Sequence, residues 1–225
     1  MNTIAVVDYG MGNLRSVAKA LEHVAPGSSV VVTSDAATIA QADRVVFPGQ
    51  GAMPDCMREL DLRALRAPVI QAARDKPFLG ICIGLQMLFD FSEEGGIAGL
   101  GIFRGVVKRF PADAMVTPEG TRLKVPHMGW NHVRQECVHP LWHGIAPDSR
   151  FYFVHSFYPE PADASIVAGT SCYPFRFTCA VARDNIFGVQ FHPEKSQAAG
   201  LALLRNFAEW DGSWPAHRQT TSATA

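Results

Sequence analysis

The sequence predicts a single α/β domain with a central mixed, largely parallel sheet flanked by helices. Short apolar runs alternate with helical patterns through about the first 95 residues, which is typical of parallel strands joined by right-handed crossovers. From about residue 97 to 191 the chain instead reads as short strands and hairpins. No Pro/Gly/Ser-rich linker or internal repeat interrupts the sequence, so we expect one domain over residues 1–210.

The elements of the first half follow from apolar periodicity and from turn residues. Residues 3–8 form an apolar run, and residues 13–24 place apolar side chains at helical spacing behind Asn13, a suitable helix cap. Pro48 and Gly49 end a third strand. In order, we expect strands at 3–8, 30–33, 44–47 and 77–82, and helices at 13–24, 36–42, about 61–75 and about 84–91.

The second half predicts mainly strands, followed by one helix. Its last helix, at about 197–209, places Leu201, Leu204 and Phe207 on one face. Residues 211–225 are rich in small and polar residues, so we expect a disordered C-terminal tail there. The expected strands are 102–109, 121–125, 130–134, 151–157, 165–171 and a pair around the Asp184-Asn185 turn.

Cys82 lies in the most informative stretch, Phe78-Leu79-Gly80-Ile81-Cys82-Ile83-Gly84-Leu85-Gln86. An apolar run ends in Gly-x-Cys-x-Gly and a helical pattern follows, which indicates a sharp strand-to-helix turn with the thiol at its apex. Small residues are needed on both sides because such a turn leaves no room for Cβ atoms. A helix N-terminus beneath the sulfur favours the reactive thiolate. A buried structural cysteine is the alternative for an isolated thiol.

A base and an orienting carboxylate are offered by His192 and Glu194, at the end of the apolar run Gly188-Val189-Gln190-Phe191. A thiol nucleophile needs an imidazole to take its proton, and the imidazole needs a carboxylate to fix its tautomer. The two residues are two apart, so on an extended strand they would point to the same side. Only a tertiary fold could bring this pair to Cys82.

The composition suits a soluble enzyme and excludes several other classes. The net charge of −1 argues against non-specific nucleic-acid binding. The N-terminus lacks the features of a signal peptide, and no stretch approaches the ~20 apolar residues of a membrane span. The five cysteines contain no Cys-x-x-Cys, so we expect no zinc site and no disulfide framework, and hence a reducing cytoplasm. His139 and His143 have the spacing of a helical metal pair, but Pro140 and Gly144 disfavour a helix there.

Taken together, these motifs resemble the class I (Cys-His-Glu) glutamine amidotransferases, and within them the glutaminase subunits of imidazole glycerol phosphate synthase. The resemblance runs from residue 3 to about residue 210, with the motifs in the right order. Besides Gly80-Ile81-Cys82-Ile83-Gly84, the segments that carry it are Asp8-Tyr9-Gly10-Met11-Gly12-Asn13-Leu14, Phe47-Pro48-Gly49-Gln50-Gly51-Ala52-Met53, Pro126-His127-Met128-Gly129-Trp130-Asn131 and Phe191-His192-Pro193-Glu194-Lys195-Ser196.

The resemblance implies hydrolysis of glutamine by a Cys82–His192–Glu194 triad, with no metal and no organic cofactor. It also implies that the backbone amides of Gln50 and Ile83 bind the oxyanion of the tetrahedral intermediate. The family often has an apolar residue where this chain has Gln50, a change that a backbone donor tolerates.

Contacts to the substrate and to a partner protein are implied in the same way. Gln86 lies four residues past Cys82, one helical turn on, and so can face the same pocket. The implied partner is a cyclase subunit, a (β/α)₈ barrel that uses the ammonia and forms a heterodimer with the glutaminase. The substrate-binding candidates are Gly51, Gln86, Ser156 and Phe157, and the partner-contact candidates are Asn13, Arg15, His127, Met128 and Trp130.

Three other functions remain as alternatives. An amidotransferase subunit could serve another synthase, although the Pro-His-Met-Gly-Trp-Asn segment speaks against pyridoxal phosphate, GMP or anthranilate synthesis. A non-catalytic regulatory domain on the same fold should have lost one triad member, and all three are present. A cysteine peptidase-like hydrolase would be acylated by a peptide rather than by glutamine.

Overall fold

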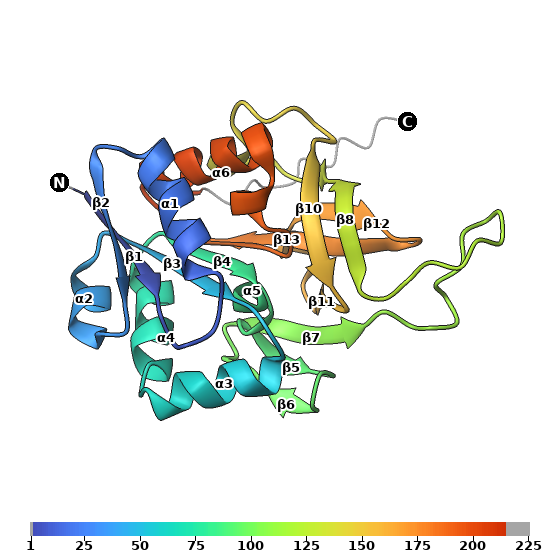
Figure 1. The fold of residues 1–225 in the computed structure, drawn as a ribbon, viewed down its shortest axis with the longest axis horizontal. Coiled ribbons are helices and arrows are strands. Elements are labelled where there is room, and N and C mark those ends of the chain that lie inside the picture. The colour runs from blue at the N-terminus through green and yellow to red at the C-terminus, as the bar shows by residue number, and fades with distance from the viewer. Residues whose placement is uncertain (1, 215–225) are drawn as a thin grey trace, which may run out of the picture.

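An eight-stranded mixed sheet forms the centre of the structure, a computed structural model that describes residues 2–214 (Figure 1). The strand order is β2-β1-β3-β4-β14-β13-β12-β9. Neighbours from β2 to β14 pair in parallel, whereas the pairs that follow are antiparallel. The expected mixed α/β sheet is therefore confirmed. Its strands are β1 (Asn2–Val7), β2 (Ser28–Thr33), β3 (Arg44–Gly49), β4 (Phe78–Cys82), β9 (Arg134–Gln135), β12 (Val167–Cys172), β13 (Arg176–Arg183) and β14 (Ile186–Val189).

Helices cover both faces of this sheet. On one face α1 (Leu14–Val24) packs against α6 (Gln197–Glu209), and on the other α2 (Ala36–Gln41) packs against α4 (Arg66–Asp75) (Figure 1). The central strands β3 and β4 are buried along their whole length, as expected for strands covered on both sides. The remaining helices are α3 (Met53–Leu62), α5 (Ile83–Gln86) and the short 3₁₀ turns η1 (Pro140–Trp142), η2 (Ala164–Ile166) and η3 (Pro193–Lys195).

Two smaller sheets lie beside the antiparallel half of the large one. One has the strand order β11-β7-β5-β6, and the other pairs β10 with β8 (Figure 1). Between β7 and β8 the chain makes a long excursion that projects from the body of the molecule. The strands are β5 (Phe89–Ser92), β6 (Ile97–Ala98), β7 (Phe103–Arg109), β8 (His127–His132), β10 (Arg150–His155) and β11 (Phe157–Pro161). None of the helices in residues 2–214 is long and apolar enough to cross a membrane.

Three expected elements were wrong. The helix expected at 84–91 stops at Gln86, because backbone bonds from Leu100 to Met87 and from Phe103 to Leu88 draw the next residues into β5. The helix expected at 61–75 is the pair α3 and α4; α3 starts earlier because Pro54 lies in its first turn, where proline is tolerated. The strand expected at 121–125 is absent, and residues 111–126 contain only a single β-bridge.

The expected disordered tail began at residue 211, but its first four residues are held in place. The Trp214 indole donates to the Val138 carbonyl at 2.9 Å, and the Trp210 indole donates to the Ser213 carbonyl at 2.8 Å. The expectation was therefore wrong for residues 211–214. Residues 215–225 lie outside the described residues.

The turn from β4 into α5 passes very close to β3. A Cβ atom on Gly84 would lie 1.8 Å from the Phe47 carbonyl oxygen, and one on Gly80 would lie 3.2 Å from the Gly84 carbonyl oxygen. A side chain at residue 84 therefore cannot be accommodated without moving backbone. This confirms the expectation that the glycines around Cys82 are required by space.

We predict that Gly84→Ala lowers the free energy of unfolding by at least about 2 kcal/mol, because the methyl group must displace the β3 backbone. Gly27→Ala is the matched control, since nothing lies within 4 Å of the added Cβ. Its stability should stay within about 0.5 kcal/mol of the parent. Urea denaturation measures both variants, and equal stabilities for the two would contradict the close approach.

Candidate active site

Cys82 lies at the apex of the turn between β4 and α5. Its backbone has φ 57° and ψ −113°, a conformation that residues other than glycine rarely adopt. Such strain is typical of a nucleophile elbow, where the turn presents the side chain at the carboxyl end of a sheet strand. The side chain is only 5% exposed, so the sulfur faces a pocket rather than bulk solvent.

His192 and Glu194 reach the same place through β14, the parallel neighbour of β4. His192 Nδ1 lies 2.9 Å from Glu194 Oε1, and because a carboxylate only accepts, Nδ1 donates this hydrogen bond. Nε2 is left buried without a protein partner and available to the thiol. The pair meets through the 3₁₀ turn η3 and not along an extended strand, so the expected geometry was wrong although the contact was anticipated.

The charge on His192 is set by its two neighbours. Burial disfavours the imidazolium, but Cys82 and Glu194 outweigh that effect and raise the pKa of His192 to about 10. The Glu194 side chain is 1% exposed, so its negative charge is little screened by water. The structure therefore favours a protonated imidazole beside Cys82.

A pocket of about 230 Å³ surrounds these groups. Its volume is below the roughly 300–1,000 Å³ typical of drug-sized ligands, which suits a molecule of amino-acid size. Every residue expected at the oxyanion site or the substrate site lines it, whereas Glu194 lies behind His192. The lining residues are Gln50, Gly51, Cys82, Ile83, Gln86, Glu94, Pro126, Val154, His155, Ser156, Phe157, His192 and Lys195.

Two glutamine side chains make a buried polar network under the pocket. Gln86 Nε2 donates to the Phe157 carbonyl at 3.1 Å and to Gln190 Oε1 at 3.0 Å. Gln190 Nε2 in turn faces Cys82 Sγ at 3.8 Å. Both amide hydrogens of Gln86 are used, so its orientation is fixed and Oε1 stays buried without a protein partner. An unpaired acceptor in a pocket wall favours a ligand that carries an N–H donor.

Gln190 was missed by the sequence analysis. A signal was present, because it is the one strongly polar side chain in the apolar run from Ile186 to Phe191. It is fully buried, and a buried amide in such a run needs specific partners.

The turn after β3 forms the opposite wall of the pocket. Gln50 and Gly51 are exposed at its mouth, and Gly51 has φ +108°, which favours glycine. The Cys56 thiol donates to the Gln50 carbonyl at 3.5 Å, a weak hydrogen bond. Ile83 directly follows Cys82 and lines the pocket from the other side.

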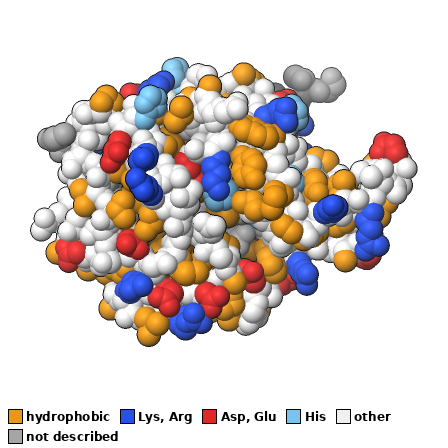
Figure 2. Space-filling view, in the orientation of Figure 1, with side chains coloured by type: hydrophobic (Ala, Val, Ile, Leu, Met, Phe, Trp, Pro, Cys, Tyr) orange, Lys and Arg blue, Asp and Glu red, His pale blue; other side chains and the backbone are white. Residues whose placement is uncertain are grey.

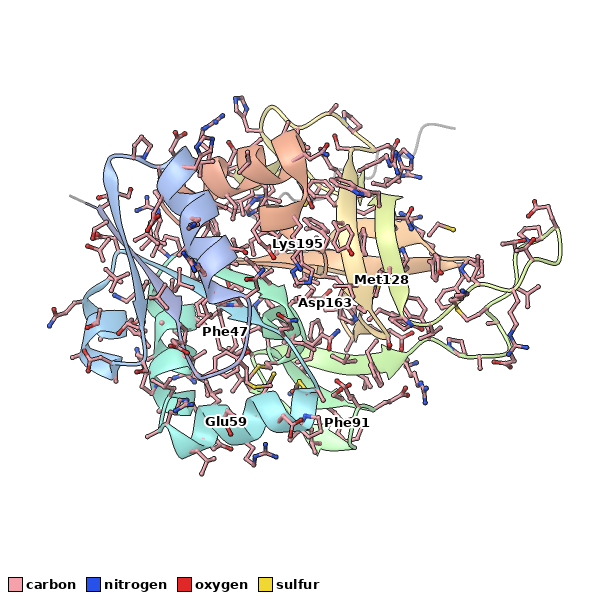
Figure 3. The ribbon with its side chains drawn as sticks, in the orientation of Figure 1. Phe47, Glu59, Phe91, Met128, Asp163 and Lys195 are labelled. Carbon is pink, nitrogen blue, oxygen red and sulfur yellow. The ribbon has the colours of Figure 1, made fainter. Side chains whose placement is uncertain are left out.

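The expected partner-contact residues do not all lie on the surface. Met128 is 62% exposed and Trp130 37% exposed on β8, whereas His127 is only 3% exposed. Figure 2 shows hydrophobic side chains gathered over β8 and β10, and Figure 3 places Met128 and Lys195 on this face. Arg15 is exposed and Asn13 half-buried at the start of α1. The His127 side chain was therefore wrongly assigned to a surface contact, because its strand position points inward.

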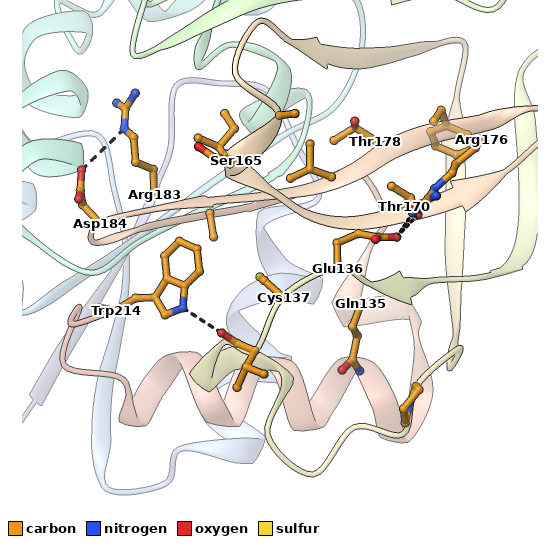
Figure 4. A pocket seen from close by; sticks show the side chains of 17 residues that line it. Gln135, Glu136, Cys137, Ser165, Thr170, Arg176, Thr178, Arg183, Asp184 and Trp214 are labelled. Carbon is orange, nitrogen blue, oxygen red and sulfur yellow. Dashed lines mark hydrogen bonds and ion pairs between the residues drawn. The ribbon is translucent and has the colours of Figure 1, made fainter. Parts of the chain in front are cut away.

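A second cavity, of about 1070 Å³, lies at the far edge of the sheet, and Cys137 is the one thiol in its lining (Figure 4). Its charged groups are paired with each other, as Arg176 is with Glu136. Burial raises the pKa of Cys137, which lines it, to about 11, so this thiol stays protonated at neutral pH. Burial likewise raises the pKa of Cys56 to about 11. No group of three or more potential metal ligands comes together in residues 2–214.

Comparison with known proteins gives the family. A model of the class-I glutamine amidotransferase family matches residues 5–210. Among solved structures, a glutamine amidotransferase superposes with a TM-score of 0.68 at 15% identity, covering 91% of this chain and 97% of that one. A chain of PurLQS from Thermotoga maritima gives 0.64 at 18% identity, covering 92% and 98%. The chain belongs to the class-I glutamine amidotransferase family.

Within that family, the chain has its higher sequence identities to one group of proteins. It is 68% identical over 208 residues to imidazole glycerol phosphate synthase subunit HisH of Dechloromonas aromatica, which covers 92% of this chain and 96% of the relative. It is 69% identical over 210 residues to the subunit HisH of Nitrosospira multiformis, covering 93% and 99%. Within the family, the chain therefore groups with the HisH subunits of imidazole glycerol phosphate synthase.

We predict that Glu194→Gln lowers the kcat of glutamine hydrolysis more than tenfold with little change in KM, because removing a triad carboxylate leaves binding intact but misorients the base. Glu160→Gln is a matched control, since Glu160 is an exposed partner of Lys108 outside the pocket. Steady-state kinetics of glutamine hydrolysis measure kcat and KM for both variants and the parent. A near-parental kcat in Glu194→Gln would mean that another group orients His192.

Proposed function

We propose that this chain is the glutaminase subunit of imidazole glycerol phosphate synthase. It hydrolyses glutamine to glutamate and ammonia, and the ammonia serves a cyclase partner. The observation that carries the proposal is that Cys82 and His192 line one pocket of amino-acid size, with Glu194 hydrogen-bonded to His192 behind it.

The reaction follows from the positions of these groups. Cys82 thiolate attacks the carboxamide carbon of glutamine, and the developing oxyanion accepts hydrogen bonds from the backbone amides of Gln50 and Ile83. Protonated His192 gives its Nε2 proton to the departing ammonia, leaving a γ-glutamyl thioester. Water deprotonated by His192 then attacks the thioester, and glutamate and the thiolate are released. Glu194 keeps the imidazole oriented throughout.

The substrate's amino-acid moiety is held by other residues of the pocket lining. Gln86 Oε1, buried and without a protein partner, accepts from the substrate ammonium group. Gly51, Ser156 and Phe157 border the same space and complete the site. This chemistry requires neither a metal nor an organic cofactor.

A second protein that uses the ammonia is indicated by the relatives of this chain, because they are named as subunits of imidazole glycerol phosphate synthase. We assign this role to the cyclase subunit, a (β/α)₈ barrel that forms a heterodimer with this chain and makes imidazole glycerol phosphate and aminoimidazole carboxamide ribotide in histidine biosynthesis. The exposed apolar residues Met128 and Trp130 support a contact surface on β8. Asn13 and Arg15 extend the proposed contact surface.

The alternatives are less well supported. An amidotransferase subunit of another synthase shares the fold, but structural neighbours such as PurLQS are only 18% identical, against 68% for the HisH relative. A regulatory domain without activity has no need for a complete triad. The pocket of about 230 Å³ is small for a peptide substrate.

All five cysteines are free thiols, which supports a reducing cytoplasm as the location.

Replacing the nucleophile tests the proposal directly. We predict that Cys82→Ala or Cys82→Ser abolishes glutamine-dependent synthesis by the complex, whereas synthesis from added ammonium salts survives, because only the ammonia source is lost. Product formation is measured with each nitrogen source. Loss of both activities in a folded variant would contradict the role of Cys82, and Cys172→Ser, which changes a thiol outside the pocket, is the control.

The glycine-containing turn at residues 49–51 predicts dependence on the partner. Because the turn reorients easily, the Gln50 amide can face the oxyanion site in a minor state that the partner selects. We predict that the isolated chain hydrolyses glutamine slowly and that activity rises steeply when the partner is present with its own ligand bound. Steady-state assays of the chain alone, with partner, and with partner plus ligand measure this. Full activity of the lone chain would contradict the switch but not the triad.

A further inference from the structure

Two buried histidines outside the triad are joined by a hydrogen bond. His127 Nδ1 lies 2.9 Å from His155 Nε2, and the two side chains are only 3% and 6% exposed. His155 also lines the pocket around Cys82. The triad mechanism uses neither of them, and a phenylalanine would fill either space without the cost of burying imidazole nitrogens.

The direction of every hydrogen bond in this cluster follows from its two ends. At one end His155 Nδ1 lies 2.8 Å from the Phe157 carbonyl, which only accepts, so Nδ1 carries the proton. At the other end Asn131 Oδ1 accepts from the His132 amide, so Nδ2 is the group that donates to His127 Nε2 at 3.2 Å.

The middle bond is then determined as well. His127 Nε2 accepts, so in the neutral ring Nδ1 donates to His155 Nε2. The result is a one-directional chain from Asn131 through His127 and His155 to the Phe157 carbonyl. Placing a second proton on either imidazole would set two donors against each other. Burial lowers the pKa of His127 to about 4 and that of His155 to about 3, in agreement with two neutral rings.

Aromatic packing fixes the planes of both rings. His127 is stacked between Tyr173, with ring centroids 4.0 Å apart, and Phe153, at 5.0 Å. His155 contacts Phe110 at 5.2 Å and Phe177 at 5.4 Å. Because the surroundings are apolar, each ring nitrogen can bond only to its neighbour in the chain of hydrogen bonds. Removal of one member of that chain therefore leaves a buried polar group without a partner.

The chain of hydrogen bonds ends on the Phe157 carbonyl oxygen, which also orients Gln86. The Phe157 carbonyl accepts from His155 Nδ1 and from Gln86 Nε2, which occupies both of its lone pairs. Gln86 then holds Gln190, whose amide faces the Cys82 sulfur. Without the imidazole donor, the Phe157 carbonyl would be held less firmly. The orientation of the Gln86 amide, and hence the position of its unpaired oxygen in the pocket wall, would then be less well fixed.

We infer that His155 and His127, anchored by Asn131, are positioning residues for the glutamine site: they fix the Phe157 carbonyl and thereby the Gln86 amide that receives the substrate. The inference rests on the proposed function for the identity of the substrate. It replaces the expected role of His127 in partner contact with an inward role.

Four variants, assayed in the complex with the cyclase partner, test this role. His155→Phe fills the aromatic space but removes the donor, and should raise the KM for glutamine about tenfold while kcat changes less than about threefold, the loss of one buried hydrogen bond. His155→Asn keeps an amide donor near the Nδ1 position and should restore KM to within about threefold of the parent. His127→Phe leaves His155 Nε2 unpaired, and should raise KM by an intermediate factor.

His139→Phe is the matched control. His139 is also a buried histidine among aromatic rings, but its Nδ1 accepts from the Leu141 amide and it does not line the pocket. The KM of His139→Phe for glutamine should equal that of the parent, even if the free energy of unfolding changes. An unchanged KM in His155→Phe, or an equal rise in His155→Asn and His139→Phe, would overturn the positioning role.

Nuclear magnetic resonance of the full chain gives a readout that does not need activity. Imidazole nitrogen shifts at neutral pH should show both His127 and His155 as neutral rings protonated at Nδ1. Protonation of either ring at Nε2 would overturn the hydrogen-bond chain even if the Phe variants fail to fold. If the parent complex does not hydrolyse glutamine, the proposed function and the proposed substrate are both wrong. The histidine tautomers would still show whether the chain of hydrogen bonds is present.

Discussion

Parallel pairing between β4 and β14 is the interaction on which the site depends. It aligns the carboxyl ends of two strands that are far apart in the sequence, so that Cys82 at the end of one lies beside His192, just beyond the other. Parallel strands end at the same edge of a sheet, which is why open α/β sheets bind ligands there. The order of the strands in the sheet therefore brings Cys82 and His192 to the same edge.

Burial gives the site its chemical character. The pocket contains one thiol next to an imidazole whose pKa is raised by the sulfur and by Glu194, whereas burial, followed by nearby acidic groups, raises the pKa of Cys56 and Cys137. Burial also makes an unpaired polar group costly. Gln86 and Gln190 avoid most of this cost by hydrogen bonding to each other, and one Gln86 oxygen is left without a protein partner at the pocket.

The proximity of His192 to Glu194 and the sharp turn at Cys82 could be predicted from the sequence because their signals are local. Gly-x-Cys-x-Gly reflects a turn in which Gly84 has no room for a side chain, and His192 and Glu194 are close enough in the chain to meet without any knowledge of the fold. The fold class followed from alternating apolar patterns. The helix expected at 84–91 was wrong because long-range pairing with residues 97–103 overrides its helical pattern.

Roles that depend on which way a side chain points were harder to predict. His127 was grouped with Met128 and Trp130, yet alternation along β8 turns Met128 and Trp130 outward and His127 inward together with Asn131. Application of the two-residue strand period to this motif would have separated them. Gln190 and His155 were missed because their partners Gln86 and His127 are far from them in the sequence.

The proposed mechanism requires that Cys82 forms a γ-glutamyl thioester with glutamine. Rapid acid quenching of the complex during turnover, followed by peptide mass spectrometry, would locate the acyl group. We expect a γ-glutamyl adduct on the peptide that contains Cys82 and on none of the peptides that carry the other four cysteines. Release of glutamate with the adduct on a different cysteine, or with no adduct in a quench fast enough to trap one, would contradict the account.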